Sequence, residues 1–269
     1  MAGRLEGKVA FITGAARGQG RAHAVRLASE GADVIALDNC ESAQTTTYPG
    51  ATEEDLAETA ALGEKEGRRV VARKADIRDF DAVSAVVQEG LAELGRLDVV
   101  VANAGICSAA MSWEIPVEKW RETIDTNLTG TFFTVKATVP TLIEQGTGGS
   151  IIITSSVAGL RGLPFLADYA ASKHGVTGLA KTLANELAQF SIRVNTIHPH
   201  GVATGMQPAE MFELTQQYAA TLGPIFMGSL PDPVSQPEDI AAAVAFLASE
   251  ESRHVTGIQL PVDLGTLAR

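Results

Sequence analysis

Short apolar runs alternate with longer amphipathic stretches along almost the whole chain. The runs have the unbroken hydrophobicity of strands buried on both faces, and the stretches between them repeat apolar positions at the helical period. Strands are expected at residues 8–13, 33–38, 69–73, 97–102, 150–155, 192–197 and 258–261. Helices are expected at residues 18–30, 79–94, 117–144, 166–189 and 237–249. This alternation predicts a single α/β domain over residues 1–269, a doubly wound parallel sheet of the Rossmann type, with about seven strands and helices on both faces.

The bulk composition narrows the classes of function. The chain has 269 residues, and 21 Lys and Arg against 32 Asp and Glu give a net charge of −11. So acidic a chain is a poor partner for nucleic acids or anionic membranes. The first residues lack the apolar core of a signal peptide, and no apolar run approaches the roughly 20 residues of a membrane span. A cytoplasmic protein is expected.

Neither a metal site nor a disulfide framework is expected. The two cysteines, Cys40 and Cys107, do not form a CxxC pair. His198 and His200 lie two residues apart at the end of a predicted strand. With no third His or Cys near them in the sequence, they do not indicate a zinc site.

A glycine-rich turn follows the first predicted strand and opens the first helix. It runs from Thr13 to Gly20, and it presents backbone N–H groups and a helix N-terminus that can hold a pyrophosphate. Its candidate cofactor residues are Gly14, Arg17, Gly18, Gln19 and Gly20. Asp38 ends the second strand, where a carboxylate can bind ribose hydroxyls and repel a 2′-phosphate. Arg17 could attract that phosphate, but the fixed carboxylate weighs more, so the sequence favours NAD over NADP.

A tyrosine and a lysine are spaced to share one face of a helix. Tyr169 and Lys173 lie four residues apart in a predicted helix, and Ser156 precedes the tyrosine by thirteen residues. A free tyrosine, with a pKa of roughly 10, is a poor base at neutral pH. A nearby lysine cation should favour the phenolate, and oxidised nicotinamide should favour it further. The tyrosine can then exchange a proton with a substrate hydroxyl that Ser156 holds in line.

Together these motifs resemble the short-chain dehydrogenase/reductase family over nearly the whole chain. The other matching segments are Ala75-Asp-Ile77, Asn103-Ala-Gly105, Asn127, Ser155-Ser156 and Pro199 through Thr204. The resemblance implies catalytic roles for Asn127, Ser156, Tyr169 and Lys173, with Asn127 holding a water of a proton relay. It also implies a homotetramer built on the two long helices.

The resemblance further implies which residues contact the cofactor outside the glycine-rich turn. They are Asp38, Asp76, Ile77, Asn103, Ala104, Gly105, Tyr169, Lys173, Pro199, Val202 and Thr204. The position of Asp76 implies contact with adenine, and those of Val202 and Thr204 imply contact with the nicotinamide carboxamide and nearby phosphate oxygens. His200 departs from the family pattern, which often has glycine after this proline, so its role stays open.

An insertion at about residues 39–55 separates Asp38 from the next strand. Its end contains Thr52 and Asp55, which are spaced for the capping box of a helix. The insertion could fold over the adenosine half of the cofactor, or it could be a tolerated surface loop. Its Tyr-Pro-x-Ala-Thr-x-x-Asp-Leu run resembles the mycofactocin-coupled dehydrogenases, which include carveol dehydrogenase-like proteins. That resemblance implies a tightly held NAD that an external mycofactocin redox carrier reoxidises.

The substrate pocket is expected beyond the carboxyl ends of the strands. Its walls would be residues 106–113, residues 160–166 and a lid at about residues 206–230. The apolar lid suits a terpenoid or alicyclic alcohol or ketone, unless its side chains pack against the domain itself. The predicted reaction is hydride transfer between an apolar secondary alcohol and its ketone. Two alternatives stay open: an ordinary dehydrogenase with exchangeable NAD that acts on a steroid or 3-hydroxyacyl substrate, and a non-catalytic NAD-binding sensor or scaffold.

Overall fold

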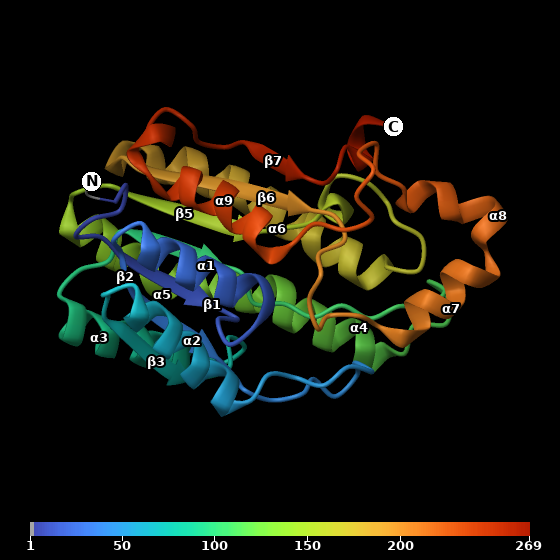
Figure 1. Ribbon diagram of the computed structural model, residues 1–269, viewed down its shortest axis with the longest axis horizontal. Coiled ribbons are helices and arrows are strands. Elements are labelled where there is room, and N and C mark those ends of the chain that lie inside the picture. Colours follow the sequence, from blue (N-terminus) through green and yellow to red (C-terminus); the bar gives the residue numbers. More distant parts are fainter. Residues whose placement is uncertain (1–2) are drawn as a thin grey trace.

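The computed structural model describes residues 3–269 and contains one seven-stranded parallel sheet covered by helices on both faces (Figure 1). The strand order is β3-β2-β1-β4-β5-β6-β7. The strands are β1 (Val9–Thr13), β2 (Asp33–Asp38), β3 (Val70–Lys74), β4 (Val99–Ala102), β5 (Gly149–Thr154), β6 (Ile192–Pro199) and β7 (Gln259–Val262). The predicted doubly wound fold is confirmed, and residues 1–2 of the predicted domain lie outside the described residues.

The helices form two layers. Helices α1, α2 and α9 pack on one face of the sheet, and α3, α5 and α6 pack on the other. The bounds are α1 (Gly18–Ser29), α2 (Glu53–Lys65), α3 (Phe80–Leu94), α4 (Val117–Ile124), α5 (Gly130–Gln145), α6 (Ala167–Leu187), α7 (Ala209–Gln217), α8 (Ala219–Leu222) and α9 (Pro237–Ala248). Within residues 3–269, none of these helices is both long and apolar enough to cross a membrane.

The predicted helix over residues 117–144 is interrupted. A π-helical turn, Asp125–Thr129, separates α4 from α5. The sequence shows no sign of it, because the apolar spacing continues through the turn and no proline or glycine precedes it there. Such turns often occur at functional sites, because they reorient the side chains and backbone groups of one turn.

Burial of the sheet on both faces explains the unbroken apolar runs. In β1, Phe11 packs against the layer of α3, α5 and α6, while its neighbour Ile12 packs against the layer of α1 and α9. Both side chains are fully buried, as alternation along a strand between two helix layers requires.

The strand order reverses at β1, which pairs with β2 on one side and β4 on the other. In a doubly wound sheet this reversal leaves a crevice at the carboxyl ends of the two central strands. The insertion and the lid both lie at this end of the sheet, and the insertion runs out toward α4 and α7 (Figure 1).

Candidate active site

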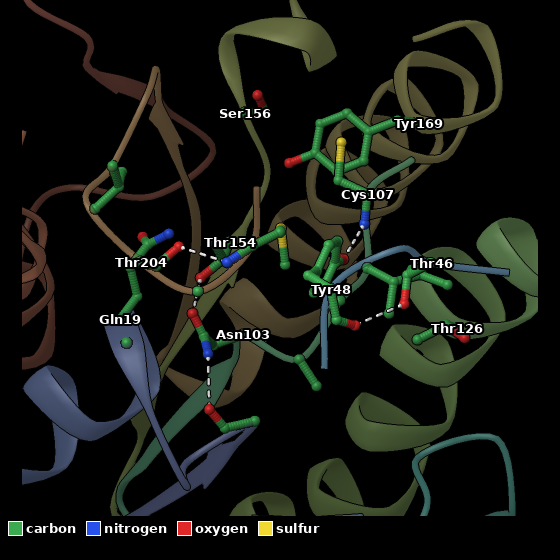
Figure 2. A pocket seen from close by; sticks show the side chains of 18 of the residues that line it. Gln19, Thr46, Tyr48, Asn103, Cys107, Thr126, Thr154, Ser156, Tyr169 and Thr204 are labelled. Carbon is green, nitrogen blue, oxygen red and sulfur yellow. Dashed lines mark hydrogen bonds between the residues drawn. The ribbon is translucent and has the colours of Figure 1, made fainter. Parts of the chain in front are cut away.

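A cavity of about 640 Å³ occupies the crevice, extending from the glycine-rich turn past Tyr169 to the lid (Figure 2). Most of the predicted site residues line it. They are Gly14, Arg17, Gly18, Gln19, Gly20, Asp38, Ile77, Asn103, Ala104, Gly105, Ser156, Tyr169, Lys173, Pro199, Val202 and Thr204. Asp76 and Asn127 do not line it. The Asp76 carboxylate pairs instead with Arg78, whose side chain does reach the cavity.

The glycine-rich turn packs so closely on itself that side chains are excluded. A Cβ on Gly20 would lie 1.9 Å from the carbonyl oxygen of Gly14, and Gly14 itself has a φ of 66°. The amide of Asn103 donates to the carbonyl of Thr13 at 3.1 Å, which fixes the end of β4 beside the turn. At Gly14 and Gly20 the turn therefore brings bare backbone close to the cavity.

The residues around this turn fit a dinucleotide. The Oε1 atom of Gln19 is buried and has no hydrogen-bond partner among residues 3–269, so it can accept a hydrogen bond from a ligand. Asp38 accepts the N–H groups of Ala16 and Cys40, each at 3.0 Å, and these bonds hold its carboxylate beside the turn. The Arg17 guanidinium donates to the carbonyl of Pro49, so it is already engaged by the insertion.

Tyr169 and Lys173 lie in the first two turns of α6, as predicted. The ammonium of Lys173 is buried, donates to the carbonyl of Thr154 at 2.8 Å and lies 5.5 Å from the centre of the Tyr169 ring. The hydroxyl of Ser156 lies on the same side of the cavity as the phenol oxygen (Figure 2). The Ser155 hydroxyl instead bonds the carbonyl of Lys173 at 3.1 Å, so Ser156 is the serine that is available to a ligand.

Burial reverses the expected electrostatics of the tyrosine. It raises the pKa of the Tyr169 phenol, Cys107 raises that pKa further, and a hydrogen bond with Ser156 lowers it. Burial also lowers the pKa of Lys173 to about 8. In the protein without a ligand, the loss of water on burial outweighs any lowering of the Tyr169 pKa by the lysine cation, and the effect of the lysine on the phenolate stays a prediction. Without a ligand, Tyr169 is a neutral phenol at pH 7.

Asn127 sits in the π-helical turn and holds the loop that follows β4. Its Oδ1 accepts the N–H of Ile106 at 2.8 Å, and its Nδ2 donates to the Ile106 carbonyl at 2.9 Å and to Ser172 at 3.1 Å. A Cβ on Gly105 would lie 3.1 Å from the Oδ1 of Asn127 and 3.5 Å from the Nζ of Lys173. The two side chains therefore border the backbone of Gly105 and leave little room for a side chain there. Both amide hydrogens are used within the protein, and the water relay stays a prediction.

His198 holds the backbone of Ser156, the predicted catalytic serine, and the sequence did not reveal this contact. Its Nδ1 donates to the Ser156 carbonyl at 2.7 Å, because a carbonyl can only accept. Its Nε2 therefore accepts from the hydroxyl of Thr196 at 2.7 Å. Burial lowers the pKa of His198 to about 4, which keeps the ring neutral and this arrangement constant near pH 7.

His200 lies just beyond the end of β6 and lines the cavity, whereas His198 lies within β6 and is fully buried. Strand alternation does not explain this difference, because residues two apart in a strand point to the same side. Its Nδ1 is buried without a hydrogen-bond partner in the described part of the chain. Burial lowers its pKa, so the ring is neutral at pH 7. A neutral imidazole at this place adds a polar group to an otherwise apolar part of the cavity wall.

The insertion is tightly held over the cavity. The carboxylate of Glu122 accepts the N–H groups of Gln44 and Thr45, each at 2.9 Å, and the Thr45 hydroxyl at 2.6 Å. The phenol of Tyr48 accepts the N–H of Cys107 at 3.0 Å (Figure 2). The predicted capping box of α2 is also present. These contacts hold the insertion against the domain, and part of it lines the cavity, so that a role as a cover over the cofactor stays a prediction.

The lid both packs against the domain and borders the cavity. The rings of Tyr218 and Phe226 lie 5.7 and 6.2 Å from that of Phe165, in a separate apolar cluster. Met211 and Phe226 also line the cavity. Part of the apolar lid therefore packs against the domain, and part of it borders the cavity. In residues 3–269, no group of three or more His, Cys, Asp or Glu side chains is arranged to hold a metal ion.

Comparison with known proteins agrees with this geometry. A family model described as short chain dehydrogenase matches residues 8–213. The chain belongs to this family. It is 44% identical over 272 residues to the (-)-trans-carveol dehydrogenase of Rhodococcus erythropolis, a match that covers 98% of each protein.

Two crystal structures resemble this dehydrogenase along almost its entire length. The short chain dehydrogenase from Mycobacterium paratuberculosis bound to NAD is 50% identical, with a TM-score of 0.96 over 99% of this chain and 100% of that one. The carveol dehydrogenase from Mycobacterium avium in complex with NAD is 48% identical, with a TM-score of 0.94 and the same coverage. Both of these proteins hold NAD, the nucleotide that the site residues fit.

Proposed function

We propose that this dehydrogenase uses NAD to interconvert an apolar secondary alcohol, of the terpenoid or alicyclic type, and its ketone. The observation that carries the proposal is one continuous cavity, in which the glycine-rich turn, the Ser156–Tyr169–Lys173 group and an apolar lid all take part. The similarity to two carveol dehydrogenases supports the alcohol class.

The reaction follows from what each side chain can do. When bound, NAD supplies the group that accepts or donates hydride. The Ser156 hydroxyl orients the substrate oxygen, and Tyr169 takes the hydroxyl proton in oxidation or returns one in reduction. Lys173 is held on the Thr154 carbonyl, where a cation favours the phenolate form of Tyr169 once ligands replace the cavity water.

The preference for NAD over NADP rests on the end of β2. The Asp38 carboxylate is fixed by two backbone N–H groups, and it would repel a 2′-phosphate. Arg17, the cation that could offset this repulsion, is bonded to Pro49 of the insertion.

The hydrogen bonds that hold the insertion against the domain support slow exchange of NAD. Release would require breaking contacts to Glu122, Arg17 and Cys107 together. A cofactor that stays bound must be reoxidised in place, and mycofactocin is the external carrier that we propose for this role. Further parts of the proposal are a cytoplasmic location and a homotetramer formed through α5 and α6. On α5 the side chain of Phe132 is 44% exposed in the single chain, which suits such a contact.

The test begins with protein purified without added nucleotide. We expect mass spectrometry of the denatured protein to identify NAD, and we expect carveol or cyclohexanol to reduce it in a single turnover. Further turnovers should need an artificial acceptor such as a redox dye, even with excess free NAD. Rapid turnover with free NAD alone would instead indicate the ordinary dehydrogenase, to be tried on steroid and 3-hydroxyacyl substrates. Bound NAD that no alcohol reduces would indicate a sensor or scaffold.

A further inference from the structure

One residue of the insertion contacts the lid directly. The hydroxyl of Thr47 accepts the N–H of Ala209 at 3.2 Å and donates to the carboxylate of Glu210 at 2.8 Å. These partners are the first two residues of α7, more than 160 positions away in the sequence. The segment that lies over the cofactor half of the cavity is thus bonded to the segment that lies over the substrate half.

Helix α7 needs such a partner at its start. The first N–H groups of any helix have no acceptor within the helix, and a side chain at the N-cap position usually supplies one. Here the N-cap residue is Pro208, which provides no side-chain hydrogen bond. Thr47 takes over this function from a distant part of the chain. Glu210 strengthens the contact, because its carboxylate lies in the first turn, where the helix dipole favours negative charge.

The position of α7 matters because this helix forms one wall of the cavity. Met211, Phe212 and Thr215 line the cavity from it, within two turns of the contact with Thr47. None of the residues of α7 is fully buried, but Met211 and Leu214 pack against the apolar cluster around Phe165, and the Glu210 carboxylate also lies 3.8 Å from the Lys119 ammonium of α4. Packing therefore supports one side of the helix, and the hydrogen bonds of Thr47 fix its N-terminal end.

The next residue of the insertion contacts the opposite wall. Tyr48 accepts the N–H of Cys107, which belongs to the loop after β4 and borders the cavity beside Tyr169. Figure 2 shows Tyr48 and Tyr169 on either side of the Cys107 segment. Two consecutive residues of the insertion thus hold two walls of the substrate half.

We propose that Thr47 is a positioning residue for the alcohol pocket: it caps α7 from the insertion and so couples the cover of the cofactor to the lid over the alcohol. The inference rests on the proposed function, since it assumes that the lid encloses the alcohol. It assigns the insertion a second role, in substrate binding, besides retention of the nucleotide.

The test compares Thr47→Val, which keeps the shape and removes the hydroxyl, with Thr47→Ser, which keeps the hydroxyl. Loss of one helix cap corresponds to a change of about five-fold in an equilibrium. We expect Thr47→Val to raise KM for the alcohol about five-fold with kcat within about two-fold, because the contact acts through α7 and not on the reacting atoms. Thr47→Ser should restore the wild-type KM. Thr221→Val is the matched control, because the Thr221 hydroxyl bonds only the carbonyl of Tyr218 within the lid.

Amide hydrogen exchange provides a readout that does not depend on catalysis. In the protein as purified, peptides covering residues 209–217 should exchange faster in Thr47→Val than in wild type, while peptides of α6 stay unchanged. Equal exchange and equal KM in wild type and Thr47→Val would overturn the proposal. So would failure of Thr47→Ser to restore either quantity, or the same change in Thr221→Val. If wild type oxidises no alcohol, the proposed function fails, and the exchange measurement still decides whether Thr47 caps α7.

Discussion

The floor and the cover of the cavity are built on different principles. The floor is the carboxyl ends of β1, β4 and β5 with the start of α6. Its Lys173 and Ser156 side chains are buried and bonded to nearby backbone, and Tyr169 is half-buried between them and the cavity. Lys173 is 4% exposed and Ser156 is 8% exposed. The cover is the insertion and the lid, whose side chains are half-buried or exposed, with Phe212 at 72%. A few long-range hydrogen bonds hold the cover in place.

This difference separates the chemistry from the choice of ligand. A buried floor keeps the proton-transfer groups in one geometry, whatever enters above them. A cover with little core of its own can open locally at a small cost in free energy, as ligand entry requires. We therefore expect changes to the floor to act mainly on kcat, and changes to the cover to act on KM and on nucleotide release.

The largest effect should come from the floor. Tyr169→Phe removes the group that exchanges the proton and keeps the ring, so we expect kcat for alcohol oxidation to fall at least ~10²-fold. Nucleotide content after purification should not change. Tyr218→Phe is the control, because its phenol packs in the lid and does not line the cavity. Turnover near the wild-type rate in Tyr169→Phe would show that another group transfers the proton.

The pH dependence should report the same tyrosine. Burial raises the pKa of Tyr169, so its phenolate fraction is small at pH 7 and grows with pH. The initial rate of alcohol oxidation needs the phenolate and should rise up to about ten-fold per pH unit above neutrality. Ketone reduction needs the phenol and should be fastest near neutrality, then fall in alkali. His198, with a pKa of about 4, stays neutral throughout and adds no step. Lys173, whose pKa burial lowers to about 8, loses its charge within the same range, so the rise should become less steep above pH 8. An oxidation rate independent of pH between 7 and 9 would contradict this assignment.

Next in size should be an effect on the choice of nucleotide. Asp38→Asn removes the charge at the end of β2 and keeps an oxygen for one of the two backbone N–H groups that the carboxylate accepts. Because the charge repels a 2′-phosphate, we expect the preference for NAD over NADP to fall about ten-fold. The ratio of the two kcat/KM values, measured after the bound nucleotide is stripped, tests this. Asp81→Asn, an exposed change of the same charge on α3, should leave the ratio unaltered.

The floor could be predicted from the sequence because its determinants are local. The turn up to Gly20 and the four-residue spacing of Tyr169 and Lys173 are both visible in short segments. The cover could not be predicted, because Thr47 and Thr45 bond partners far along the chain, which no periodicity indicates. The direction of the Tyr169 pKa shift was missed for a related reason. Burial is a property of the whole fold, whereas the neighbouring lysine is visible in the sequence.

The smallest effect should come from a substitution of Glu122, which weakens the attachment of the insertion and does not change the residues of the floor. Burial raises its pKa, but hydrogen bonds from Thr45 and Gln44 hold that pKa below the ordinary value, so the carboxylate is charged at pH 7. Glu122→Gln keeps the size but leaves one acceptor oxygen, whereas the carboxylate uses Oε1 for Gln44 and Oε2 for Thr45. The variant therefore loses the bonds of one oxygen, and the remaining ones are no longer charge-assisted, which makes them roughly half as strong.

We expect bound NADH to dissociate from Glu122→Gln about five-fold faster, which corresponds to the free energy of about one hydrogen bond. The rate constant of a single turnover should not change. The decay of NADH fluorescence on mixing with excess NAD measures the release rate. Glu118→Gln, exposed on the same helix, is the control. If release is unchanged while the single-turnover rate falls, the insertion acts on the floor, and the separation between floor and cover is wrong. Faster release at an unchanged single-turnover rate would show that retention of the nucleotide resides in the cover.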